Sequence, residues 1–275
     1  MGKFDGKQIT GLVGGLVFRK GEDKTTIVQT RAVKVRQTKA TKEAGSLFGK
    51  SSKLAKAIRT NLFSIVLDGY DNKMVNRLTK LTRELLTHCY KKDTKTFTFR
   101  PDSFDRLQGF EFNLKSPTTA KLWVKPEVKL IGNQLQVHLP EMQIPDQFQF
   151  PLGTNACEIR IAVAMMVLDQ SLEHEGLFQS MEVNSDQTFI AAQQFNFEVP
   201  DGCFCVAGLN LYYYTRTQEG IRSSSGEKSF HPSAICGAII TPGTFVRPPA
   251  VRTANGGRAS EWHDILGLSL ATTGV

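Results

Sequence analysis

The chain has 275 residues, of which 40% are hydrophobic and 22% are charged, and its formal net charge is +8 at pH 7. This length and composition are typical of one large domain or two small ones with a real apolar core, and they exclude a chain that is disordered throughout. The longest apolar run, residues 161–168, has the length of a buried strand, so we expect no membrane span.

Charge is distributed unevenly along the sequence. Residues 1–95 contain 21 Lys and Arg against 8 Asp and Glu, a balance of +13, whereas residues 96–275 contain 13 against 18, a balance of −5. This asymmetry predicts a basic arm over 1–95 and a β body over 96–241, and residues 242–275 form a Pro- and Gly-rich extension.

The N-terminus is charged and lacks a secretory pattern, which predicts synthesis in the cytoplasm. Residues 11–18 alternate apolar and small side chains, and we interpret them as one strand that can add to the edge of another sheet. Their glycines are predicted to allow close strand packing or a bulge, because no Gly-Lys-Ser/Thr element opens a helix as a phosphate loop requires. The residues expected to make contact here are Leu12, Gly14, Gly15, Leu16 and Phe18.

Two helices are predicted next. Apolar residues recur at three- and four-residue steps over 41–67, and after the turn signal Asp68-Gly69, Asp71 can cap a second helix over 74–89. The short connection predicts an antiparallel helical hairpin. Cations before and within the first helix are expected to form a charged contact face: Arg31, Lys34, Arg36, Lys50, Lys53, Lys56 and Arg59.

From residue 96 onward, short alternating runs separated by Pro, Gly and Asn predict antiparallel strands. The expected strands are 96–100, 110–114, 121–124, 128–131, 135–139, 156–168, 188–199, 203–215 and 234–240. A tight turn is expected at 131–134, and residues 172–176 are interpreted as a solvated turn. The predicted class is therefore α+β, mainly β, with one or two immunoglobulin-like sandwich units that divide near 140–151.

No residue pattern indicates catalysis, a metal or a cofactor. The five cysteines include no CxxC pair and are expected to be reduced and mostly buried. The histidines lack ligand spacing, and the close carboxylate pairs, Asp102 with Asp105 and Glu173 with Glu175, are expected in solvated loops. The serine run at 223–225 lacks a nucleophile elbow. We therefore expect a protein that is not an enzyme.

The sequence resembles a family of uncharacterised Bacteroidetes proteins that has a glycine-punctuated basic N-terminal segment and a β-rich body. The resemblance covers most of the chain, the tail over 241–275 departs from it, and its elements here are 11–18, 19–21, 28–36, 109–113, 212–214 and 223–225. Since that family has no assigned activity, the resemblance implies a fold rather than a function.

The leading hypothesis is a structural protein that self-assembles or joins a larger particle, such as a filament, a phage-like tail or an injection apparatus. A basic arm that meets the acidic body of the next copy would make a heterologous contact, which propagates. The expected partners are further copies or other structural subunits, with no small-molecule substrate evident. The alternative is a nucleic-acid-binding protein that acts through the arm, and a third class is a hydrolase whose site the sequence does not reveal.

Overall fold

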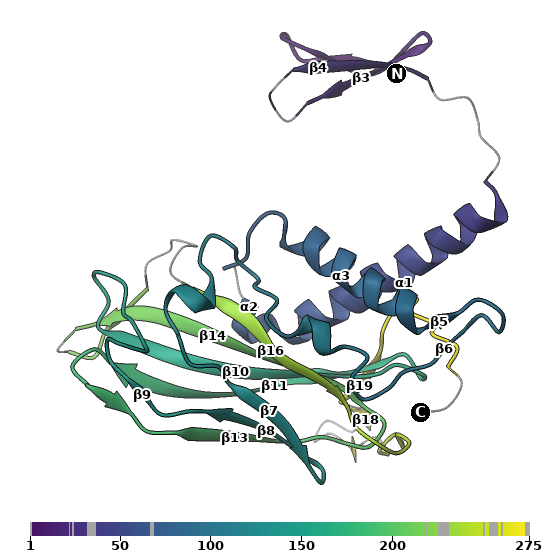
Figure 1. Ribbon diagram of the computed structural model, residues 1–275. Helices are drawn as coiled ribbons and strands as arrows, with labels where there is room; N and C mark the ends of the chain where they lie inside the picture. Colours follow the sequence, from purple (N-terminus) through teal and green to yellow (C-terminus); the bar gives the residue numbers. More distant parts are fainter. Residues whose placement is uncertain are drawn as a thin grey trace. The chain divides into compact units, whose positions relative to one another are not determined.

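The computed structural model describes residues 2–21, 23, 25–31, 37–66, 69–217, 219–224, 231–249, 251–252, 258–259 and 261–272 (Figure 1). Strands hold 40% of the chain and helices 20%, and the paired strands are antiparallel. This confirms the expectation of a mainly β protein with few helices. By contacts the chain separates into two units, Met1–Gly45 and Ser46–Val275.

The N-terminal unit contains a four-stranded sheet in chain order. Its strands are β1 (Lys3–Phe4), β2 (Ile9–Val13), β3 (Leu16–Lys20) and β4 (Thr26–Thr30). The single strand expected over 11–18 is wrong, and so is the bulge interpretation of its glycines, because Val13 pairs with Leu16 around a two-residue Gly14-Gly15 turn. Gly14 has φ +58°, which a residue without Cβ adopts at no steric cost.

Three helices follow: α1 (Lys39–Asn61), α2 (Phe63–Val66) and α3 (Met74–Cys89). The first expected helix is thus divided at Leu62, and Asp68 of the expected turn lies outside the described residues. The expected cap by Asp71 is wrong, because the N-cap of α3 is Lys73, which makes no side-chain capping hydrogen bond. Asp71 lies two residues earlier, where its Oδ1 accepts from the backbone N–H of Lys73 over 2.8 Å. The hairpin arrangement of the helices stays a prediction.

The larger unit is organised around a six-stranded sheet. Its strands are β10 (Ala156–Val167), β11 (Leu172–Asn184), β14 (Phe204–Arg216), β15 (Arg222–Ser223), β16 (Ser233–Ile240) and β19 (Trp262–Asp264). β10 pairs with β11 and β14, β14 also pairs with β15 and β16, and β19 pairs with the start of β11. The solvated turn expected over 172–176 is therefore wrong, because these polar residues pair within the sheet.

A three-stranded sheet, ordered β13-β8-β7, lies on one face of the six-stranded sheet. It consists of β7 (Glu127–Ile131), β8 (Gln134–Leu139) and β13 (Gln193–Glu198). Ile131 pairs with Gln134 around the expected tight turn, where Gly132 has φ +57°. The expected strand over 188–199 is divided into β12 (Phe189–Ile190) and β13, and β12 pairs with β9 (Met142–Gln143).

Short elements complete the larger unit. They are β5 (Tyr90–Lys91), β6 (Thr96–Phe97), the 3-10 helices η1 (Asp105–Leu107) and η2 (Thr118–Ala120), β17 (Val251–Arg252) and β18 (Arg258–Ala259). Of the strands expected over 110–114 and 121–124, the structure has only the isolated bridges Glu111 to Ala234 and Leu122 to Phe148. None of the described helices is both long and apolar enough to cross a membrane.

Both faces of the six-stranded sheet are buried along its strands β10, β14 and β16. Even-numbered residues of β10, such as Ala162 and Met166, join one apolar cluster with the helices, whose members include Leu54 and Ile58. Odd-numbered residues, such as Ile161, join a second cluster with the three-stranded sheet. Since successive strand residues point to opposite faces, burial on both sides requires the continuous apolar run seen in the sequence. The helices thus share a core with the β body, and the chain separates after residue 45 rather than 95.

Candidate assembly surfaces

The N-terminal sheet has no core of its own. Among its described residues between 2 and 31, every side chain is exposed or half-buried. Directly paired residues point to the same face of a sheet, so the register places Phe18 beside Val28 on β4, and Val13 beside Leu16. Six apolar side chains share one face of the N-terminal sheet, which we call its apolar face: Phe4, Ile9, Val13, Leu16, Phe18 and Val28. The register places Gly11, Lys20, Thr26 and Thr30 on the same face.

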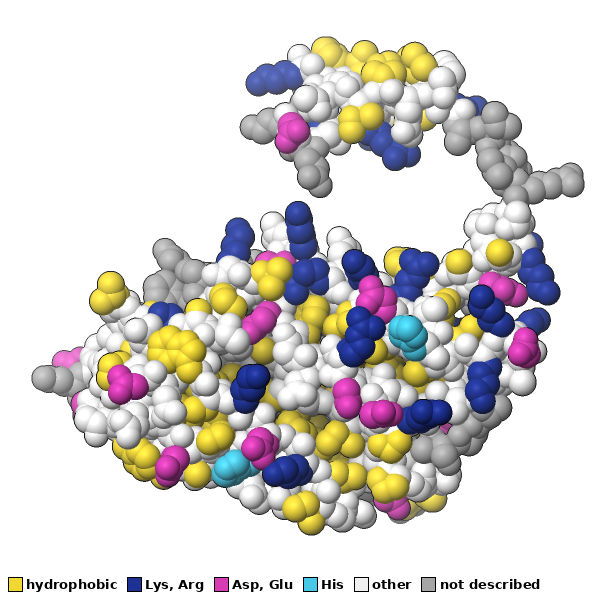
Figure 2. Space-filling view, in the orientation of Figure 1, with side chains coloured by type: hydrophobic (Ala, Val, Ile, Leu, Met, Phe, Trp, Pro, Cys, Tyr) yellow, Lys and Arg dark blue, Asp and Glu magenta, His cyan; other side chains and the backbone are white. Residues whose placement is uncertain are grey.

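This apolar face is open to solvent. Phe4 is 69% exposed and Val28 is 50% exposed, and Figure 2 shows hydrophobic side chains gathered along the sheet. The opposite face carries Lys3, Thr10, Leu12, Val17, Arg19, Ile27 and Gln29. One face therefore has six apolar side chains and one lysine, whereas the other has three apolar, two basic and two uncharged polar side chains.

The residues predicted to make contact in this segment do not all lie on one face of the sheet. Leu12 lies on the face opposite to Leu16 and Phe18, and Gly14 and Gly15 form the turn between β2 and β3. The backbone N–H of Arg31 donates to the Gly15 carbonyl over 2.7 Å. Lys34 and Arg36 lie outside the described residues.

Sequence reasoning missed four members of the apolar face: Phe4, Ile9, Val13 and Val28. The apolar and β-branched residues of 9–13 and 26–30 were visible in the sequence, although neither segment alternates strictly. Reading the Gly-Gly pair as a turn would have placed these residues together.

Two of the four predicted helical cations already have contacts inside the larger unit. The ammonium group of Lys50 lies 5.1 Å from the centre of the Phe97 ring, and Lys53 donates to the Gly267 carbonyl. Lys56 is exposed, and Arg59 is half-buried. Figure 2 shows further Lys and Arg side chains over the side that carries the helices, to which α3 adds the exposed residues Lys80 and Arg83. We call Lys56, Lys80 and Arg83 the basic helical surface.

A groove with carboxylates around it lies where the turn between β7 and β8, the end of β13, and strands β10, β11 and β19 converge. Its volume is about 580 Å³. Its floor is apolar and includes Met165, Leu177, Val199 and Trp262. Its carboxylates are Glu198, Asp201 and Glu261, all exposed. We call this site the acidic groove; no sequence signal predicted it, because only tertiary structure brings these residues together.

One histidine lies in the wall of the acidic groove. The Nε2 atom of His174 lies 3.2 Å from Oε2 of Glu261, and its Nδ1 lies 2.6 Å from the carbonyl of Glu175. Its ring meets Trp262 edge-on at 5.0 Å. The imidazole is therefore held by neighbours on both nitrogens and on its ring.

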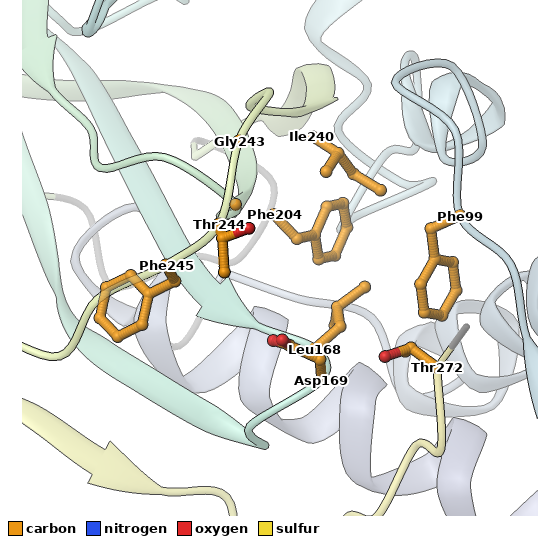
Figure 3. Close-up of a pocket in the computed structure, with 10 residues that line it drawn as sticks. Phe99, Leu168, Asp169, Phe204, Ile240, Gly243, Thr244, Phe245 and Thr272 are labelled. Atoms are coloured by element: carbon orange, nitrogen blue, oxygen red, sulfur yellow. The ribbon is translucent and has the colours of Figure 1, made fainter. Parts of the chain in front are cut away.

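A smaller cavity of about 180 Å³ lies at the end of the six-stranded sheet. Figure 3 shows Phe99, Phe204 and Ile240 facing one another across it, with Asp169 at its side and Phe245 pointing away. Asp169 is the one titratable group among its lining residues, so the cavity brings together no nucleophile and base.

Thiols and metal-binding residues give no further site among the described residues. Four cysteines, at 157, 203, 205 and 236, are buried, and Cys89 is half-buried. Burial raises the pKa of Cys157, which keeps this thiol protonated. The described part of the chain contains no group of three or more His, Cys, Asp or Glu placed to hold a metal ion.

No protein-family model and no curated protein matches this sequence. The resemblance to a Bacteroidetes family therefore stays a prediction, and the functional argument depends on the surfaces described above.

Proposed function

We propose that this protein is a non-enzymatic structural subunit that assembles with copies of itself or joins a larger particle, such as a filament, a phage-like tail or an injection apparatus. The supporting observation is the N-terminal sheet, which orders four strands around no buried residue. Ordering a chain costs conformational entropy, and a small sheet offsets that cost only when its apolar face is covered. A neighbouring subunit supplies that cover.

The size of the sheet indicates that it does not act alone. Strands about 4.8 Å apart, with a rise of about 3.4 Å per residue, give a face of roughly 300 Å² for this sheet. A stable interface buries about 800 Å² on each partner. The contact must therefore include further surface, and many such weak contacts add up in a repeating particle.

Binding to nucleic acid is the second candidate, and the basic helical surface favours it. Lys56, Lys80 and Arg83 are exposed and available to phosphates. Lys50 and Lys53 already make contacts inside their own unit, which reduces the number of cations available to bind phosphates. This function would show itself as polynucleotide affinity that falls steeply with salt.

We also propose two structural relationships, one to immunoglobulin-like sandwiches and one to the Bacteroidetes family. The facing antiparallel sheets and their shared apolar cluster support an immunoglobulin-like relationship. The β-rich body is in keeping with the Bacteroidetes family resemblance.

Two adjacent residues of β4 provide a matched test of assembly through the apolar face. Val28 is 50% exposed on that face, and Ile27 is 49% exposed on the opposite one. Val28→Lys places a charge in the proposed contact, so light scattering should show a shift toward monomer, whereas Ile27→Lys should assemble like the parent. Equal behaviour of the two variants would contradict the proposal.

A further inference from the structure

The acidic groove has the character of a binding site for an extended basic segment. Its floor residues Met165, Val199 and Trp262 are at least 96% buried, and the exposed carboxylates Glu198 and Glu261 lie beside this floor. An apolar floor with charged groups around it selects an occupant that carries an apolar side chain between cations. A volume of about 580 Å³ admits a few side chains rather than a folded domain.

One histidine and one arginine near the groove already have partners. His174 lies against Glu261, and Arg247 donates from Nη2 to the Trp262 carbonyl over 2.9 Å. Glu198 and Asp201 complete the set of groove carboxylates, and no ion pair of either is among the described contacts. The groove thus retains negative charge for an occupant.

The N-terminal unit has the complementary chemistry. Residues 1–45 contain ten Lys and Arg against four Asp and Glu, a balance of +6. Within this unit, β1 is an edge strand that pairs only with β2, so its other edge is open for main-chain hydrogen bonds. Its Phe4 is the most exposed large apolar residue of the sheet, at 69%, and it lies in the segment Lys3-Phe4-Asp5-Gly6-Lys7, whose two lysines outnumber the single carboxylate of Asp5.

We propose that the acidic groove of one copy receives strand β1 of a neighbouring copy. Phe4 enters over the apolar floor, and Lys3 and Lys7 face the carboxylates. This inference rests on the proposed assembly function and names the surface that the N-terminal sheet binds.

Two other sites on the larger unit fit this occupant less well. Two arginines, Arg216 and Arg222, share the single carboxylate of Glu182 at the far end of β14, so that surface has excess positive charge. The 180 Å³ cavity has one carboxylate, Asp169, and less than a third of the volume of the groove.

The two contact surfaces belong to different parts of the chain, which makes the interface heterologous. Each copy has one strand β1 and one acidic groove. When two copies bind, one strand β1 and one groove of the pair remain unoccupied. Growth then continues into a ring or a filament.

Paired variants test this arrangement in the full chain. A groove variant, Glu198→Lys with Glu261→Lys, and a strand variant, Lys3→Ser with Phe4→Ser, which adds no negative charge that could bind the altered groove, should each require on the order of tenfold more protein to assemble. Glu141→Lys with Asp186→Lys reverses two exposed carboxylates outside the groove and serves as the control that assembles like the parent.

Mixing the two defective variants gives the sharpest result. The groove variant keeps an intact β1, and the strand variant keeps an intact groove, so an equimolar mixture should form one-to-one dimers and nothing longer. Size-exclusion chromatography with light scattering measures this, and recovery of dimers also shows that both variants are folded.

The possible failures can be told apart. If the parent does not assemble at any concentration, the proposed function fails and this inference fails with it. If the parent assembles and the groove variant assembles equally well, the groove is not the receiving site and the proposed function stands. If both variants lose assembly but their mixture gives no dimer, the head-to-tail arrangement is overturned.

Discussion

Glu111 is a carboxyl group that the fold largely buries beside η2. Its Oε1 and Oε2 atoms each lie 3.0 Å from the backbone N–H of Thr118, whose hydroxyl also donates to Oε1. Burial nevertheless raises the pKa of Glu111 above its ordinary 4.5, and the hydrogen bonds from Thr118 offset only part of that effect. The folded protein therefore binds this proton more tightly than the unfolded chain does.

The raised pKa of Glu111 gives stability a defined pH dependence. The stabilisation of the protonated form is fully present below pH 4.5 and is lost as pH rises through the folded pKa. Glu111→Gln stays neutral, so the free energy of unfolding of the variant relative to the parent should increase through this window, by less than about 1.4 kcal/mol per pH unit, the limit for one proton. Chemical denaturation at a series of pH values measures it.

Asp71 serves as a control for the same measurement, because its pKa is shifted downward and its contribution to stability therefore has the opposite pH dependence. Burial raises its pKa, but hydrogen bonds from the N–H groups of Leu114 and Lys73 and from Arg77 outweigh this, and the net shift is downward from 3.8. Its contribution to stability is present above pH 3.8 and is lost as pH falls through the folded pKa. A parallel pH dependence for Glu111→Gln and Asp71→Asn would contradict one of the two assignments, and its sign would show which.

Strands β10 and β14 could be predicted from sequence, whereas β11 could not, and the difference has a physical cause. Both faces of β10 are buried, and its residues from 161 onward form a continuous apolar run. β11 is mostly half-buried or exposed and opens with Leu172-Glu173-His174-Glu175-Gly176, a pattern that local propensity assigns to a turn. Pairing with β10 and β19 makes it a strand. The acidic groove was unpredictable for the same reason, because tertiary pairing alone unites Glu198 with Trp262.

The end of helix α1 contacts β11 at a glycine. β11 shifts its register against β10 between Val163 and Met165, close to Gly176. A Cβ atom on Gly176 would lie 1.9 Å from the backbone oxygen of Asn61, so only glycine allows this approach. Nearby, the Asn61 amide donates from Nδ2 to Oε2 of Glu173 over 2.8 Å, which holds the helix end on the strand.

Gly176→Ala should therefore lower the free energy of unfolding by about 2 kcal/mol or more, because the backbone of α1 must move to admit the methyl group. Thermal melting followed by circular dichroism measures the loss. Gly49→Ala is the matched control, since Gly49 lies within α1 and its added Cβ meets nothing within 4 Å. That variant should be neutral or up to about 1 kcal/mol more stable. A Gly176→Ala protein that melts like the parent would show that the helix end is free to shift.

The larger unit holds all of the protein's apolar cores that the structure describes. Both clusters draw their buried residues from positions 54–270, and no residue of the N-terminal unit belongs to either. The N-terminal sheet has the reverse character, with an apolar face and nothing buried. For the whole molecule, this separates the surfaces that stabilise the fold from those proposed to join copies.

Deleting residues 1–31 should consequently abolish assembly and leave the melting temperature of the remaining chain unchanged. The deletion removes the four-stranded sheet and keeps every residue of both apolar clusters. Light scattering and thermal melting on the same samples measure the two properties. If the sheet instead covers its own body, the truncated chain would lose buried apolar area and melt lower, by roughly 2 to 4 °C for each kcal/mol lost in a unit of this size. A truncated chain that still assembles at the parental concentration would remove the N-terminal sheet as the joining element.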